Sequence, residues 1–158
     1  MKRIIVGSTI CCLVLGLQTA KAATRTLKLA HAVSTTAPYN LGSTEFAKML
    51  TERAGDRFEI QIFPNKQLGS ERSLVEQLQI GTIDLVVTST GPLGGFVPEM
   101  LVVDLPFLFR DTQHVDHVFE GPIGQSLLAS LEKAHIKGLA FWENGFRNLT
   151  NNRRPIRK

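Results

Sequence analysis

Several short segments of the chain distribute their apolar residues in the way that strands do. Residues 26–30 and 58–62 alternate polar and apolar side chains, which predicts strands with one solvated side. Residues 83–87 form a nearly continuous apolar run, which predicts a strand buried on both faces. A further strand is predicted near the end of the chain, over residues 136–142.

Apolar residues at helical spacing predict helices between and after these strands. The predicted ranges are 38–54, 70–80, 111–119 and 122–131. Pro38 and Pro122 each suit the first turn of a helix. Ser70 and Asp111 can each accept a hydrogen bond from the free N–H groups of a helix start.

The order of these elements predicts an α/β fold. Strand, helix, strand, helix and strand follow one another within about sixty residues, and two consecutive βαβ units favour a parallel sheet with right-handed crossovers. A turn-rich stretch, residues 89–95, follows the third strand. In open α/β sheets ligands bind beyond the carboxyl ends of the strands, so we expect a ligand site near this loop.

The first residues have the order of a secretory signal peptide. Lys2 and Arg3 are basic, residues 4–17 are uncharged and mostly apolar, and small residues occupy both ends of the triplet from Ala20 to Ala22. An uncleaved membrane anchor is the alternative, but the apolar run is shorter than the roughly 20 residues that a spanning helix needs. We therefore expect cleavage at Ala22 and export across the inner membrane into the periplasm.

Removing residues 1–22 changes the chemistry that the chain can offer. Both cysteines, Cys11 and Cys12, leave with the signal, so neither a disulfide nor a thiol nucleophile is expected in the mature chain. The 18 basic residues fall to 15 against 14 acidic ones, and four of those 15 lie in the last six residues. This distribution argues against nucleic-acid binding, which needs a basic stripe on the folded body.

Four segments then resemble one known family. Residues 64–72 read P-N-K-Q-L-G-S-E-R, and residues 77–85 read Q-L-Q-I-G-T-I-D-L. Residues 104–109 read D-L-P-F-L-F, and residues 142–151 read W-E-N-G-F-R-N-L-T-N. In this order and spacing they resemble the solute receptors of TRAP transporters (tripartite ATP-independent periplasmic), the DctP family.

The resemblance implies a two-lobed α/β receptor that closes on its ligand. Residues 1–22 would be the signal, residues 23–141 the first lobe, and residues 142–158 the hinge strand and the start of a second lobe. The implied ligand is a small carboxylate: a dicarboxylate, a sugar acid or a keto acid. The implied partner is an ion-gradient-driven membrane permease, and no cofactor is implied.

The resemblance also implies which residues contact the ligand. They are Arg147, Glu71, Ser89, Thr90, Asn144 and Trp142. A guanidinium group matches both oxygens of a carboxylate, so Arg147 suits the ligand's acidic end. Glu71 can accept hydrogen bonds from ligand hydroxyls, or it can simply be an acid in the first turn of a helix. Ser89 and Thr90 can donate to a ligand or serve turn geometry, and Trp142 can instead belong to the core.

One family feature lies outside the sequence. Family members carry a second, strand-mounted arginine beyond the segment that contains Arg147, and this sequence ends before it. Desolvating a carboxylate requires closely paired charge, so we expect weak or undetectable affinity for an organic acid. A truncated, non-binding piece of such a receptor is therefore an alternative function.

Two other classes of protein are alternatives to a TRAP receptor. A receptor for an ABC-type importer would share the two-lobed architecture but not the four motifs. An exported enzyme would need a catalytic site. The four histidines are His31, His114, His117 and His135, and only His114 and His117 could share one helix face. No third metal ligand accompanies that pair, and no G-x-S-x-G elbow is present, so no metal site or catalytic residue is predicted.

Overall fold

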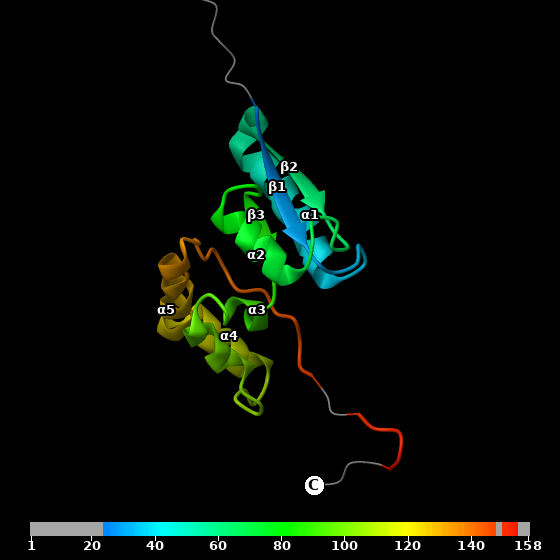
Figure 1. Cartoon of the computed structure of the whole chain (residues 1–158), viewed down its shortest axis with the longest axis vertical. Helices are drawn as coiled ribbons and strands as arrows, with labels where there is room; N and C mark the ends of the chain where they lie inside the picture. Colours follow the sequence, from blue (N-terminus) through cyan, green and yellow to red (C-terminus); the bar gives the residue numbers. More distant parts are fainter. Residues whose placement is uncertain (1–23, 148–149, 155–158) are drawn as a thin grey trace, which may run out of the picture.

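A computed structural model describes residues 24–147 and 150–154 of the chain (Figure 1). The predicted signal and its cleavage site at Ala22 lie outside the described residues. The elements follow the order β1 (Arg25–His31), α1 (Pro38–Ala54), η1 (Gly55–Arg57), β2 (Phe58–Phe63), α2 (Glu71–Gln79), β3 (Leu85–Val87), α3 (Thr90–Leu93), η2 (Pro98–Asp104), α4 (Thr112–Glu120), α5 (Pro122–Ser130) and η3 (Leu131–Ala134). Within the described residues, no helix combines the length and apolarity that a membrane crossing requires.

The strands form a parallel sheet in the order β2-β1-β3, so the predicted α/β fold is confirmed. Leu29 and Ala30 are neighbours on β1 and therefore point to opposite faces of the sheet. Their exposed fractions are 2% and 0%, so the central strand is covered on both faces. Figure 1 shows α1 and α2 packed along this sheet, as two βαβ units require.

Helix α2 connects the sheet to a second apolar core. Leu74 packs with Ala30 and Ile83 against the sheet. Its neighbour Val75 belongs to a separate cluster formed with α3, η2, α5, η3 and the segment after them. Helix α2 thus packs on the sheet with one face and on the helical part below the sheet in Figure 1 with another.

The predicted helix starts are confirmed by their capping bonds. The Ser70 hydroxyl accepts a hydrogen bond from the Ser73 backbone N–H at 3.3 Å. The Asp111 carboxylate accepts one from the His114 N–H at 2.8 Å. Each bond satisfies a donor that the helix cannot pair by itself.

Two strand predictions are corrected by the structure. Residues 136–142 form no strand, because Ile136 is buried in the helical cluster rather than beside β3. Residues 83–87 are not a strand buried on both faces. Ile83 is 2% exposed but precedes β3, and the three residues of β3 are only half-buried, since β1 is their one neighbouring strand in the described part.

The turn-rich stretch 89–95 differs from expectation as well, because its first half is helical. Helix α3 occupies Thr90–Leu93, and Ser89 is its N-cap residue. The carboxyl end of β3 therefore leads into a short helix, with Ser89 at the junction.

A buried histidine orders the loop between β1 and α1. His31 is fully buried, and its Nε2 lies 3.2 Å from the side-chain oxygen of Asn40. The amide nitrogen of Asn40 donates to the Thr35 carbonyl at 2.9 Å, which directs the amide oxygen toward the ring. This orientation assigns the proton to Nε2. The loop that leads to the start of α1 is held by these two bonds.

Candidate functional site

Glu71 and Ser89, two of the predicted site residues, are in direct contact. Glu71 is the first residue of α2, and its Oε2 accepts a hydrogen bond of 2.5 Å from the Ser89 hydroxyl. Thr88 donates to the same oxygen at 3.4 Å, a contact that sequence reasoning missed. The start of α2 and the end of β3 thus form one polar cluster. Glu71 occupies the first turn of α2, as one interpretation of it expected, and the hydroxyls it accepts in this structure belong to Ser89 and Thr88. Its contact with a ligand stays a prediction.

Thr90 belongs to a different contact. Its hydroxyl donates to the Asp104 carboxylate at 2.6 Å and so ties α3 to the end of η2. The structure gives Thr90 no bond to Glu71. In this structure Thr90 therefore serves the local packing of α3.

The other predicted residues lie on the segment that follows η3. Arg147 donates from Nη1 to the backbone oxygen of Asn144 at 3.1 Å, and both residues are exposed. Trp142 packs on Gly42 of α1, where an added Cβ would lie 3.0 Å from the indole ring. The absence of a side chain at position 42 therefore lets the segment lie close against α1.

A shallow pocket of about 410 Å³ forms where this segment meets the start of α1. Its lining residues are Pro38, Tyr39, Gly42, Phe141, Trp142 and Glu143. Trp142 is half exposed beside it. Of the predicted site residues only Trp142 lines this pocket. The polar cluster of Glu71 and Ser89 is therefore a second part of the candidate site, and neither Arg147 nor Asn144 lines the pocket.

Tyr39 connects these two sides, and sequence reasoning missed it. Burial raises the pKa of its hydroxyl, the Glu71 carboxylate raises it further, and Arg147 lowers it. Both charged groups therefore act on the same phenol. A tyrosine just after a helix-starting proline carries no sequence signal for this role, because the contact depends on tertiary packing.

The histidine pair of α4 lies apart from this site. His114 Nδ1 accepts a hydrogen bond from the Arg110 N–H at 3.4 Å, and its ring meets Phe109 edge-on. Among the residues that the structure describes, no three His, Cys, Asp or Glu side chains gather closely enough to hold a metal ion.

The ionisation of Tyr39 offers a spectroscopic test of this geometry. Tyr39 is the only tyrosine in the chain, so near-ultraviolet absorbance reports its phenolate alone. We expect a pKa above the ordinary value of about 10. Glu71→Gln should lower that pKa and Arg147→Ala should raise it, whereas Glu76→Gln, on the exposed side of the same helix, should leave it unchanged.

The same shift has a consequence for stability. Above pH ~10 the unfolded chain releases the phenol proton while the folded chain keeps it. The stability that Tyr39 contributes is thus complete below that pH and is lost as the pH rises through the folded-state pKa. A Tyr39 that titrates like a free phenol would contradict the described burial.

Comparisons with known proteins agree with this fold. The profile described as "Bacterial extracellular solute-binding protein, family 7" (DctP) matches residues 29–158. The C4-dicarboxylate-binding protein DctB of Bacillus subtilis (strain 168) is 38% identical over 130 residues, which are 82% of this chain and 37% of that protein.

Two solved structures have the same fold. A TRAP periplasmic solute-binding protein from Polaromonas sp. JS666, bound to D-erythronate, is 46% identical, with a TM-score of 0.78 over 83% of this chain and 43% of that one. The sugar acid binding protein DctPAm of Advenella mimigardefordensis, in complex with galactonate, is 33% identical, with a TM-score of 0.79 over 85% and 43%. The chain spans less than half the length of each relative. The family predicted from the four motifs is confirmed: this chain belongs to family 7 of the bacterial extracellular solute-binding proteins, the DctP family.

Proposed function

We propose that this chain is the ligand-contacting first lobe of a TRAP-type solute receptor, which binds a small organic acid and delivers it to a membrane permease. The observation that carries the proposal is the convergence of three groups. A guanidinium (Arg147) and a carboxylate that already accepts hydroxyl donors (Glu71) each act on one buried phenol, that of Tyr39.

The chemistry of these groups suits a hydroxylated carboxylate. Arg147 is exposed, and its planar fork can pair with both oxygens of a ligand carboxylate. The Ser89 hydroxyl donates its proton to Glu71, so the Ser89 oxygen and the second oxygen of the Glu71 carboxylate remain as acceptors for ligand hydroxyls. The relatives support this class of ligand: the Polaromonas protein holds D-erythronate, the Advenella protein holds galactonate, and the Bacillus protein is named for C4-dicarboxylates.

The cellular setting belongs to the same proposal. Residues 1–22 direct export, cleavage follows Ala22, and the receptor acts in the periplasm. Residues 23–141 form the first lobe, and residues 142–158 form the hinge and the start of the second. The permease supplies the transport step, and the chain itself performs no catalysis, which agrees with a family described as solute-binding.

Ligand titration of the mature chain tests this function. Trp142 is the only tryptophan, so fluorescence reports directly on the wall of the pocket. We expect saturable changes with D-erythronate, galactonate and succinate, with dissociation constants on the order of 1 mM. Erythritol, which has the hydroxyls but no carboxylate, should cause none. A flat response to every acid up to about 50 mM would contradict the proposed function and favour a non-binding fragment.

A further inference from the structure

Tyr39 is almost fully buried, yet its hydroxyl has no hydrogen-bond partner among the described residues. The side chain is 5% exposed. In the described part, His31 Nδ1 is the only fully inaccessible side-chain nitrogen or oxygen without a partner. The Tyr39 oxygen therefore keeps some accessible surface. An accessible hydroxyl without a protein partner is paired by water or by a ligand group that displaces it.

The space that Tyr39 borders is the pocket beneath Trp142. Tyr39 and Gly42 lie one helical turn apart on α1 and line this pocket together. Trp142 packs on Gly42 and lines the same pocket. A ligand group that enters here meets the side chains of Phe141, Trp142 and Tyr39.

The charges around Tyr39 decide which ligand group fits. The Glu71 carboxylate acts on the phenol, and Glu143 lines the pocket itself. Two carboxylates disfavour a further negative charge, but each can accept a hydrogen bond from a neutral hydroxyl. Arg147 is the cation that acts on Tyr39, and its effect on the pKa is opposite to that of Glu71. The carboxylate of a ligand therefore belongs beside Arg147, and its neutral end belongs beside Tyr39.

We infer that Tyr39 is a further ligand-contacting residue, whose hydroxyl bonds a ligand hydroxyl and so selects hydroxylated monocarboxylates over dicarboxylates. This inference rests on the proposed function and names the ligand class of that same site. A dicarboxylate would place its second charge beside Glu71 and Glu143, which costs binding energy. A hydroxy acid would satisfy the phenol, and a site built around a hydroxyl rejects ligands that lack one.

Tyr39→Phe tests the inference, because it removes one oxygen and keeps the ring. For D-erythronate we expect the dissociation constant to rise about 5- to 10-fold, as the loss of one hydrogen bond predicts. For succinate we expect the dissociation constant to change by less than about twofold, since succinate has no hydroxyl that could bond to the phenol. The unsubstituted chain should bind D-erythronate more tightly than succinate.

Ser43→Ala is the matched control on the same helix. Ser43 is buried and donates to the Tyr39 backbone oxygen at 2.6 Å, so this change perturbs α1 without touching the phenol. It should leave the ratio of the two dissociation constants unchanged. An unchanged affinity of Tyr39→Phe for D-erythronate, or an equal loss for both acids, would overturn the inference while the proposed function stands. Failure of the unsubstituted chain to bind any acid would overturn both.

Discussion

Replacing Leu74 by alanine should lower the free energy of unfolding by about 3 kcal/mol, the typical cost of emptying a buried leucine site. Leu74 is 0% exposed and packs α2 onto Ala30 at the centre of the sheet. Because the neighbouring Val75 attaches the helical part through the same helix, loosening α2 weakens both cores. Urea denaturation followed by far-ultraviolet circular dichroism measures the effect.

Ile80→Ala provides the matched control, since Ile80 ends the same helix but is 77% exposed. Removing the same kind of side chain there should change the free energy of unfolding by less than about 0.5 kcal/mol. Equal losses at the two positions would contradict the described packing of α2.

The sheet and its flanking helices are predictable because local patterns agree with the fold there. Residues 58–62 alternate as a half-solvated strand does, and β2 occupies Phe58–Phe63. The cap residues Ser70 and Asp111 mark helix starts that the structure places at the following residues. In these segments the residues close together along the chain are enough to predict the element that forms.

The segment after η3 is not predictable in the same way. Residues 136–142 carry enough apolar residues for a strand, but a strand also needs a partner, and the sequence does not specify one. In the structure Ile136 fills a space between helices, while Leu139 is 66% exposed. Hydrophobicity alone indicated burial correctly at Ile136 and failed at Leu139.

The candidate site, too, was predictable in its residues but not in its contacts. Glu71 and Ser89 were each predicted from the family resemblance, without any contact between them. Their contact of 2.5 Å depends on how α2 packs beside the end of β3. Tyr39 was missed because its role depends on burial and on two charges that are distant in sequence. Family motifs identify residues, whereas tertiary contacts determine which of them act together.

Replacing Arg147 by alanine should raise the dissociation constant for D-erythronate at least about tenfold. A charge-assisted bond to a carboxylate contributes more than a neutral one, and in the proposed function Arg147 supplies the cation. Arg147→Lys should give an intermediate loss, because it keeps the charge without the planar fork. Fluorescence of Trp142 during titration measures all three proteins.

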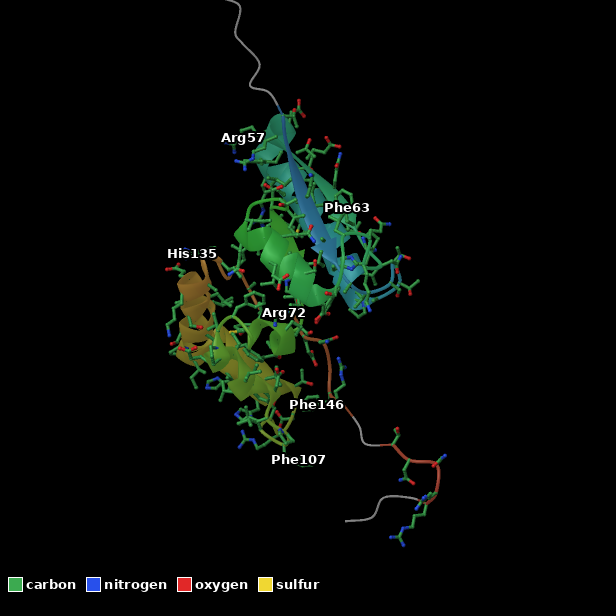
Figure 2. All side chains as sticks on the ribbon, in the orientation of Figure 1. Arg57, Phe63, Arg72, Phe107, His135 and Phe146 are labelled. Atoms are coloured by element: carbon green, nitrogen blue, oxygen red, sulfur yellow. The ribbon has the colours of Figure 1, made fainter. Side chains whose placement is uncertain are left out.

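Arg57→Ala is the control for charge alone. Arg57 lies in η1, and Figure 2 shows it at the far end of the sheet, away from Phe146, the neighbour of Arg147. It donates from Nε to the Ala54 backbone oxygen at 3.1 Å. Its replacement should leave the affinity within about twofold, since exposed charges at such separation are screened by salt. An equal loss at both arginines would indicate a nonspecific charge effect and contradict the role of Arg147.

The most direct test of the site is a two-dimensional ¹H–¹⁵N NMR titration of the mature chain with D-erythronate. The proposed function predicts chemical-shift changes concentrated on the start of α1 around Tyr39, on Glu71 and Ser89, and on residues 142–147. They should saturate with one dissociation constant. Changes that concentrate on α4 and α5, or a spectrum that stays constant up to about 50 mM acid, would contradict it.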